Sequence, residues 1–577
     1  MYYLEKKYVV LFLLILLILL FSLQFCSESN KNERKELCYI ILKLDKENNI
    51  GISENEYKLL DKLLEIAEQN IKPKRNYNFN ETISILNQIA RIHKIIGIKT
   101  PLRRSGEPLS IALKEKSFDC ENYVVTYLSI AQKLKLPLRP VFAPKHIFLE
   151  WNDGKNCFFW ETLYNIVKTK EEYINDHFIP EKTIKDGIYL TPINNEKLIA
   201  NYYNTLATYF LFEKNDFAKS YFCLMKAYYS DTLSPEIMSN FGNYYMKQGG
   251  DGMILYYYSK ALSLNQNYFS TYMNRGVYYL YVKKYMESII DLKKALSFTK
   301  DSIEKSNTYF NIGMVYKTIG DLSKAKALYD SAICYNSVNE HAYNDRGYCY
   351  FKFSKYDYAL SDYNISIKLN PNYSLYYSNR ASIKILLSDS IGALSDFCKA
   401  ISLDKNNFNA IMNRARLYLD KMEFKNALLD LNKAIELDST IAGLFYYRAI
   451  TNVILGNNSV SDKDYSKYIS MLKPQNDEDY FSELIWFQLI SRKYKEAIQY
   501  SIEATSKFPK NYYLKSYLAD AYLLDGKIDN AKNIYLKYRN KRFDGTSWKD
   551  NVADDFEQLK KFKINIPEMN KILLMLK

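Results

Sequence analysis

The stretch that decides the fold is residues 343–371, YNDRGYCYFKFSKYDYALSDYNISIKLNP, because its pattern returns in the residues that follow it. Residues 377–404 read YSNRASIKILLSDSIGALSDFCKAISLD, and residues 411–438 read IMNRARLYLDKMEFKNALLDLNKAIELD. The small residue of this pattern stands at Gly242, Gly276, Gly313, Gly347, Ala381, Ala415 and Ala449. Successive members lie 34 residues apart, except for one interval of 37. This period predicts an array of paired helices.

The pattern resembles the tetratricopeptide repeat, in which two antiparallel helices cross at small residues and proline follows the second helix, as at Pro371, Pro474 and Pro509. The resemblance implies a mainly α protein with about ten repeats over residues 197–540. One helix pair cannot bury its own apolar face, so neighbours stack into an α-solenoid with a concave groove. The resemblance implies that the first helix of each pair lines this groove. The groove would bind a protein or peptide partner. We expect it to be lined by Tyr348, Phe351, Leu375, Ile385, Tyr446, Ile450 and Val453.

Charged residues occur in matched positions within single repeats. Five repeats carry an arginine directly before the small residue, and each of these has an aspartate 16 residues after the arginine. The pairs are Arg275 and Asp291, Arg346 and Asp362, Arg380 and Asp396, Arg414 and Asp430, and Arg448 and Asp464. Repeats with an apolar residue at the first position, such as Phe241 or Ile312, have no acid at the second. We therefore expect ion pairs between the two helices of a repeat, with a structural role.

The N-terminus differs in composition from the rest of the 577 residues. Lys6 and Lys7 precede an apolar run over residues 9–23, which is typical of an export signal. Leu23-Gln24-Phe25-Cys26 resembles the signal box of bacterial lipoproteins, which implies that Cys26 is lipidated and anchors the chain to a membrane. Phe25 stands where a small residue is usual, so a transmembrane anchor over residues 8–26 is the alternative. Both interpretations place the rest of the chain outside the cytoplasm, starting with a linker over residues 27–51.

The net charge of +14 is spread along the chain without an arginine-rich arm, which argues against a nucleic-acid partner. The eight cysteines show no spacing typical of a metal site, and no motif predicts a cofactor. After the repeats, residues 541–577 predict a pair of capping helices.

Residues 52–196 do not share the period and predict a separate α+β domain. Asp119 is a good N-cap, which places Cys120 in the first turn of a helix, where the helix dipole favours a thiolate. Three strands are expected next, over residues 138–144, 146–151 and 156–161. If Asp153-Gly154 forms a two-residue hairpin turn, His146 lies directly opposite Glu161.

A cysteine at a helix start, followed by a histidine and an acid on adjacent strands, resembles the transglutaminase-like, papain-like cysteine peptidase superfamily. The resemblance covers roughly residues 80–165. It implies that Cys120 is the nucleophile, His146 the general base and acid, and Glu161 the carboxylate that orients the histidine, although aspartate is more usual at the third place. The implied reaction is attack on an amide carbonyl through a thioester.

Other interpretations remain open for the same residues. Cys120 could be a buried filler, with His146 and Glu161 serving structural roles, or Cys120 could form a disulfide with Cys157. Two functions follow from this choice. The first is an exported, membrane-anchored scaffold that binds a protein or peptide in its groove. The second is an active thiol amide hydrolase, peptidase or acyl transferase whose repeats recruit the substrate.

Overall fold

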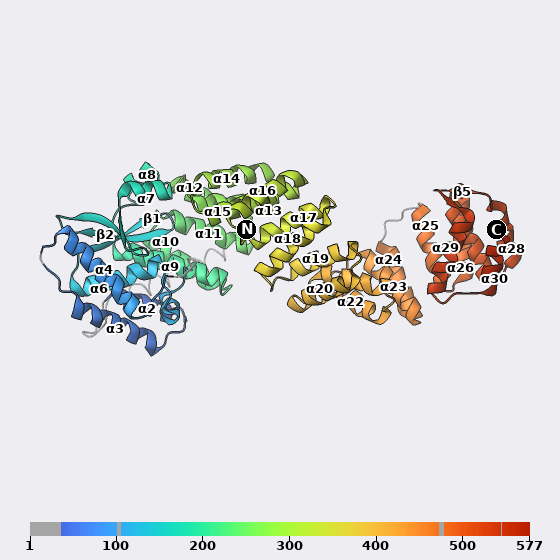
Figure 1. The fold of residues 1–577 in the computed structure, drawn as a ribbon, viewed down its shortest axis with the longest axis horizontal. Helices are drawn as coiled ribbons and strands as arrows, with labels where there is room; N and C mark the ends of the chain where they lie inside the picture. Colours follow the sequence, from blue (N-terminus) through green and yellow to red (C-terminus); the bar gives the residue numbers. More distant parts are fainter. Residues whose placement is uncertain (1–35, 75, 101–105, 472–477, 544, 577) are drawn as a thin grey trace, which may run out of the picture. The chain divides into compact units, whose positions relative to one another are not determined.

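The computed structural model describes residues 36–74, 76–100, 106–471, 478–543 and 545–576 (Figure 1). The chain separates between Asn336 and Ser337 into two compact units, here named unit 1 and unit 2. The expected export signal over residues 1–26, with Cys26, lies outside the described residues. Among the helices that are described, none is long and apolar enough to cross a membrane.

Unit 1 begins with an α+β domain whose helices pack around one central helix. The helices are α2 (Leu37–Glu47), α3 (Glu54–Asn70), α4 (Phe79–Ile95), α5 (Leu109–Glu115) and α6 (Cys120–Leu134). The central helix α6 is buried along almost its whole length and packs against α2, α3 and two strands. The range 27–51, which we expected to be a linker, contains α2, and the side chains of Leu37, Ile41 and Leu42 are fully buried in the core.

One antiparallel sheet packs against α6. Its strands follow chain order, and two short helices come after it. The elements are β1 (Leu138–Ala143), β2 (His146–Asn152), β3 (Cys157–Glu161), β4 (Ile166–Lys168), α7 (Lys170–His177) and α8 (Glu181–Lys185). The short strand β4 and the helix α7 were not expected from the sequence.

The expected register of the β2–β3 hairpin was wrong by two residues. Asn152 pairs with Cys157, so residues 153–156 form the connection. The Asp153 carboxylate accepts two backbone N–H groups of its own turn, at 2.9 and 2.7 Å, and this stabilises a four-residue connection instead of a two-residue one. Because side chains alternate along a strand with period two, this shift leaves each residue on the face that we expected.

The repeats begin at α9, and the described residues hold ten helix pairs, four in unit 1 and six in unit 2. Unit 1 contains α9 (Asn195–Phe212), α10 (Phe217–Ser230), α11 (Pro235–Gln248), α12 (Asp251–Leu264), α13 (Phe269–Tyr281), α14 (Tyr285–Ser297), α15 (Ser302–Thr318) and α16 (Leu322–Tyr335). Unit 2 contains α17 (Glu340–Lys352), α18 (Tyr356–Leu369), α19 (Ser374–Leu386), α20 (Ser390–Leu403), α21 (Phe408–Asp420), α22 (Phe424–Leu437), α23 (Ala442–Leu455), α24 (Asn458–Met471), α25 (Glu478–Ile490), α26 (Tyr494–Lys507), α27 (Tyr512–Leu524) and α28 (Ile528–Tyr538). The mainly α fold with an N-terminal α+β region agrees with the sequence.

The glycines of the pattern lie where the two helices of a pair approach most closely. A Cβ atom at Gly242 would lie 2.4 Å from the ring of Tyr258, and one at Gly313 would lie 2.6 Å from the ring of Tyr329. Each tyrosine ring is fully buried against the backbone of the facing helix. The small residue is therefore required by the large aromatic side chain that it faces.

The expected ion pairs within repeats are confirmed in all five cases. Each guanidinium donates through Nε and Nη2 to the two oxygens of its aspartate, at distances of 2.6–3.0 Å. The five aspartates are buried. Where the first position is Phe241, its ring instead stacks on Tyr257 with centroids 4.8 Å apart. The same helix crossing is thus made by either a two-bond ion pair or an apolar contact.

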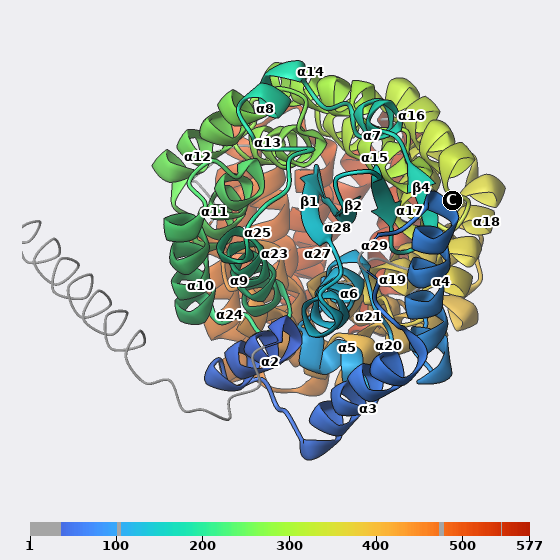
Figure 2. The same cartoon turned by 90° about the vertical axis from the view of Figure 1, so that its left-hand side faces the viewer.

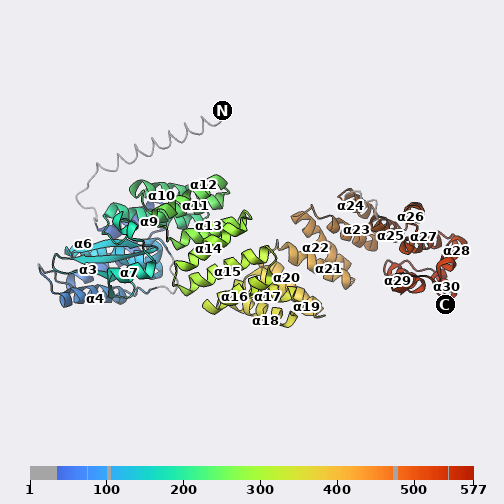
Figure 3. The ribbon, with the colours of Figure 1, turned by 90° about the horizontal axis from the view of Figure 1, so that it is seen from above.

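Unit 2 ends with β5 (Arg542–Phe543), β6 (Thr546–Ser547), α29 (Trp548–Lys561) and α30 (Pro567–Met575). The side chains of Trp548, Val552 and Phe556 are fully buried in one core with residues of the last repeats. Figure 3 shows α29 and α30 next to α28, at the C-terminal end of the chain. The hydroxyl of Ser516 on α27 donates to Asp555 on α29 at 2.7 Å. The helices α29 and α30 therefore cover the last repeat on the side of its first helix, α27.

We predict that Asp396→Ala lowers the free energy of unfolding of unit 2 by about 2–4 kcal/mol, because it leaves the Arg380 guanidinium partly buried without its carboxylate. Chemical denaturation of the full chain, followed by circular dichroism, measures the change. Asp420→Ala is the matched control, because this aspartate is exposed. Equal midpoints for the two variants would contradict a stabilising role for the ion pair.

Candidate active site

Cys120 is the first residue of α6, as the sequence predicts. The Asp119 side chain accepts the backbone N–H of Asn122 at 3.0 Å and so caps the helix. Its second oxygen accepts the N–H of Gly106 at 3.1 Å. The Cys120 side chain is partly exposed and is not bonded to Cys157, which lies free at the start of β3. The thiol is therefore accessible at the positive end of the central helix.

His146 and Glu161 meet on the sheet, although they are not directly opposite each other. His146 is the first residue of β2 and Glu161 is the last residue of β3, so the observed register makes them diagonal neighbours on one face. His146 Nε2 donates to Glu161 Oε2 at 2.5 Å. The hydroxyl of Tyr173 donates to the same oxygen at 3.2 Å, and the N–H of Leu163 donates to Oε1 at 3.2 Å. Three donors thus hold the carboxylate in place.

Burial and charge oppose each other in this pair. Burial by itself would lower the pKa of the His146 imidazole, but the neighbouring Cys120 side chain and then the Glu161 carboxylate outweigh it and raise the pKa to about 9. Burial would raise the pKa of Glu161, but the hydrogen bond and the charge of His146 bring it below its ordinary value. The structure therefore favours an imidazolium next to a carboxylate.

The second nitrogen of the histidine, Nδ1, makes no hydrogen bond of ordinary geometry among the described residues, and the Cys120 side chain is the neighbour that acts on the imidazole. His146 is only 7% exposed, and its Nδ1 is buried. His146 and Cys120 both line one cavity of about 210 Å³. The imidazole also stacks on His177, with ring centroids 5.6 Å apart and planes 6° apart. The ring is thus fixed by its neighbours, and its unpaired nitrogen is available on the side of the thiol.

The repeats form part of the wall of this cavity. Asn201, Asn204 and Thr205 come from α9, and Ser234 and Glu236 come from the start of α11. Figure 2 shows β1 and β2 of the domain inside the arc of α9 to α15. Sequence analysis did not identify these wall residues, because it treated the domain and the repeats as separate parts.

Glu121 ties the two parts together next to the thiol. This side chain is only 6% exposed and accepts hydrogen bonds from the Asn201 amide and the Thr205 hydroxyl, both at 2.7 Å. Burial raises the pKa of Glu121 to about 7, and the charge of Asp119 adds to the effect. The start of α6 is therefore anchored on the first repeat helix.

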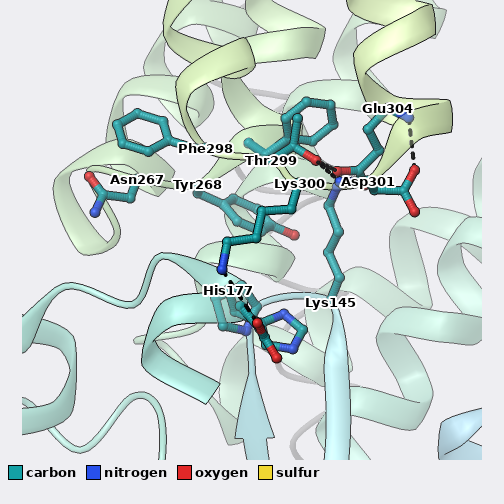
Figure 4. A pocket seen from close by; sticks show the side chains of 12 residues that line it. Lys145, His177, Asn267, Tyr268, Phe298, Thr299, Lys300, Asp301 and Glu304 are labelled. Atoms are coloured by element: carbon teal, nitrogen blue, oxygen red, sulfur yellow. Dashed lines mark hydrogen bonds and ion pairs between the residues drawn. The ribbon is translucent and has the colours of Figure 1, made fainter. Parts of the chain in front are cut away.

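A second cavity of about 170 Å³ is also lined by Lys145 (Figure 4). Lys145 borders both cavities, and its ammonium pairs with Glu304 of α15 at 2.7 Å. Lys300 pairs with Asp176 of α7 at 3.5 Å across the same opening. Glu304 lies in the N-terminal extension of α15, which has 17 residues where α13 has 13. In the sequence, the interval of 37 residues between Gly276 and Gly313, where the other intervals are 34, reflects this longer helix.

The seven expected groove residues lie on the first helices of three repeats in unit 2. Tyr348 and Phe351 are on α17, Leu375 and Ile385 are on α19, and the other three are on α23. All seven side chains are at least partly exposed. Tyr446, Ile450 and Val453 also pack partly against the core shared with the capping helices. Whether the seven bind a partner remains a prediction.

We predict that Glu161→Gln lowers the pKa of His146 below about 9, because burial and the Cys120 side chain remain while the carboxylate charge is lost. In the wild type, the raised pKa stabilises the folded domain fully below about pH 6.5, and this contribution is lost as the pH rises through about 9. An NMR titration of histidine-labelled full chain measures the change. Tyr173→Phe is the control, and an unchanged titration in Glu161→Gln would contradict the assignment.

Comparison with known proteins identifies the repeats. The family model described as tetratricopeptide repeat matches residues 306–337. The curated protein "BBSome complex member BBS4" of Bos taurus is 27% identical over 114 residues, which are 20% of this chain and 21% of that protein. The chain thus spans about a fifth of the length of this curated relative.

Solved structures with similar regions cover only part of this chain. Pseudomonas aeruginosa pilF is 16% identical, covers 39% of this chain and 100% of its own, and has a TM-score of 0.35. YrrB, described as a TPR protein with an unusual peptide-binding site, is 20% identical, covers 32% and 93%, and has a TM-score of 0.28. A repeat protein of Parabacteroides merdae is 18% identical, covers 44% and 98%, and has a TM-score of 0.31. The family match shows a tetratricopeptide repeat at residues 306–337, and the described residues on both sides of it form helix pairs of similar length.

Proposed function

We propose that this chain joins a transglutaminase-like thiol amide hydrolase or acyl transferase to a repeat array that binds a protein or peptide. The observation that carries the enzymatic part is the contact of His146 Nε2 with Glu161, while His146 Nδ1 is left unpaired beside the cavity that holds Cys120. Cysteine, histidine and acid also follow the chain order of the superfamily that the sequence resembles.

The proposed reaction needs one thiol and one base. The Cys120 proton is already held on His146 Nδ1, as a thiolate beside the imidazolium, and the sulfur attacks the carbonyl carbon of an amide. The carbon–nitrogen bond then breaks, the amine leaves with the proton returned by His146, and a thioester remains on Cys120. Water or a second amine attacks the thioester, loses a proton to His146, and releases the acyl group as the proton returns to the sulfur. Glu161 holds the imidazole in orientation throughout.

The oxyanion donor that we propose is the backbone N–H of Cys120. This group lies in the first turn of α6, where N–H groups have no partner within the helix. The developing negative charge on the carbonyl oxygen would then lie at the positive end of the helix dipole.

The array supports a second function, that of a binding scaffold. Its first helices in unit 2 expose apolar side chains, including Leu375 (39% exposed) and Ile385 (38% exposed). Such a mixed, partly apolar surface suits an extended peptide. The scaffold function would remain if Cys120 served only as packing.

The location that we propose follows from residues 1–26, where a basic start and an apolar run precede Cys26. Export with lipidation of Cys26, or a single N-terminal membrane helix, would hold the domain close to a membrane surface. Mass spectrometry of the protein from its native membrane distinguishes the two, because only the first leaves Cys26 as a modified N-terminus.

We predict that His146→Ala slows alkylation of Cys120 by iodoacetamide at pH 7 about tenfold or more, because a protonated imidazole stabilises the reactive thiolate. Mass spectrometry of the Cys120 peptide from full-length protein measures the rate separately from the other cysteines. His341→Ala is the matched control, since this histidine bonds Tyr376 in unit 2. Equal Cys120 rates in wild type and His146→Ala would contradict the enzymatic function.

We also predict that Ile385→Asp weakens binding of peptides selected on the full chain from a displayed library by about tenfold or more, because it places a charge in the apolar groove. Fluorescence anisotropy of the selected peptides measures the affinity. Ile391→Asp is the control, since this side chain is 80% exposed on the second helix α20. Equal losses in both variants would contradict binding in the groove.

A further inference from the structure

Two carboxyl groups meet where the last repeat of unit 2 joins the capping helices. Asp520 lies on α27, and its side chain is fully buried. Asp555 lies on α29 and acts on Asp520 both as a hydrogen-bond partner and as a like charge. Asp520 Oδ2 is buried and accepts no hydrogen bond from a donor among the described residues, so it is the oxygen that can carry a proton toward Asp555. Two carboxyls in contact are rarely ionised together, and such a pair holds one proton between them.

The other hydrogen bonds of this acid pair come from neutral hydroxyls. The hydroxyl of Tyr535 on α28 donates to Asp520 Oδ1 at 2.5 Å. The hydroxyl of Ser516 on α27 donates to Asp555 Oδ2 at 2.7 Å. These bonds hold three helices together around the two carboxyls, but they supply no positive charge. Full ionisation of the pair would therefore place uncompensated negative charge in the core.

The neighbouring titratable groups do not offset this charge. Tyr517 of α27 and Tyr446 of α23 are neutral phenols, and Asp554 of α29 adds a further negative charge next to the pair. Lys560 and Lys571 of the capping helices pair with glutamates of their own helices. No lysine or arginine in the described part of the chain forms an ion pair with either carboxyl of the acid pair.

The pair is placed to respond to pH in the neutral range. Burial raises the pKa of Asp555 to about 6, and burial together with the charge of Asp555 raises the pKa of Asp520 well above its ordinary value. Residues 478–577 contain no histidine and no cysteine, so no other side chain there has an ordinary pKa between 5 and 8. Once exposed to water, both acids return to a pKa of about 4, so any opening of this contact near pH 7 releases a proton.

The capping helices cover aromatic side chains on the first helices of the last repeats. Trp548 and Phe556 are fully buried in the shared core. The ring of Phe562, which follows α29, lies 6.5 Å from the ring of Trp486 on α25. Trp486 in turn packs on Tyr517, with ring centroids 5.8 Å apart. Displacement of α29 would thus uncover an aromatic surface on the side of the array where we expect the groove.

We infer that α29 and α30 form a lid on the last repeats, and that a proton shared by Asp520 and Asp555 holds this lid closed. Loss of the proton leaves two negative charges at the contact of α27 with α29, and opening relieves their repulsion by exposing both to water. The lid is stable in acid and opens more readily as the pH rises. This inference is independent of the proposed thiol chemistry, and use of the uncovered surface for binding rests on the proposed scaffold function.

The test is hydrogen–deuterium exchange of the full chain between pH 5 and 8, measured by mass spectrometry of peptides. Exchange rates are divided by the intrinsic rate at each pH, so that the resulting protection reports only how often the helices open. Peptides from α29 and α30 report the lid. Peptides from α21 and α22 serve as the internal reference, since the ion pair of Arg414 with Asp430 compensates the buried charge there.

We expect protection of α29 and α30 to fall about tenfold per pH unit between pH 6 and 8, the slope for release of one proton on opening. Protection of α21 and α22 should stay constant. Asp520→Asn should make protection of the lid nearly independent of pH in this range, because its amide is neutral, can donate to Asp555, and keeps an oxygen that accepts from Tyr535. Asp554→Asn, at the exposed acid next to Asp555 on α29, should keep the wild-type slope.

Constant protection of α29 and α30 between pH 6 and 8 in the wild type would overturn the proton-held lid, whether or not any variant folds. An equal loss of protection in α21 and α22 would overturn it too, because unit 2 would then open as a whole. The wild-type slope in Asp520→Asn would overturn the assignment of the proton to this pair. None of these measurements depends on Cys120, so the proposed thiol chemistry stands or falls separately.

Discussion

The structure depends on the fact that a pair of helices with one apolar face cannot bury that face by itself. Each repeat buries its apolar face by packing on its neighbours. At the ends of the array, other parts of the chain must cover the apolar faces of the terminal helix pairs. In unit 1 the α+β domain packs against the first helices of the early repeats, through contacts such as Tyr189 with Glu236. In unit 2 the helices α29 and α30 cover the last repeats, with Trp548 and Phe556 buried. The domain thus covers the first repeats, and it also contains the site of the proposed thiol chemistry.

The crossing within a repeat can be made in two ways, and each has its own cost. The ion pair of Arg380 with Asp396 has good two-bond geometry, but both charges lose water when they are partly buried. The stacked rings of Phe241 and Tyr257 avoid that loss. An intermediate mixture, with one charge and one apolar residue, would leave a charge without a partner, which explains why the two positions change together along the chain.

The sequence was sufficient for features with a local cause. The period, the Arg–Asp pairs and the capped start of α6 all follow from residues close together in the chain. The expected register of the hairpin was wrong because the Asp-Gly pair predicts a two-residue turn, whereas hydrogen bonds to the Asp153 side chain stabilise a longer one. His146 and Glu161 are nevertheless in contact, because a shift of the strand pairing by two residues leaves both side chains on the same face of the sheet. The part of the cavity wall that comes from α9 and α11 could not be predicted from neighbouring residues in the sequence, because it depends on how the α+β domain packs against the repeats.

The docking also determines the properties of the candidate site. Glu304 reaches Lys145 from the start of α15, which has 17 residues where α13 has 13, and Lys145 directly precedes His146 in the chain. Asn201 and Thr205 hold Glu121, which directly follows Cys120 on α6. The repeats therefore hold the chain beside both reacting residues. An array that served only to recruit distant partners would have no physical reason to make these two contacts, so the repeats are better understood as a structural part of the site.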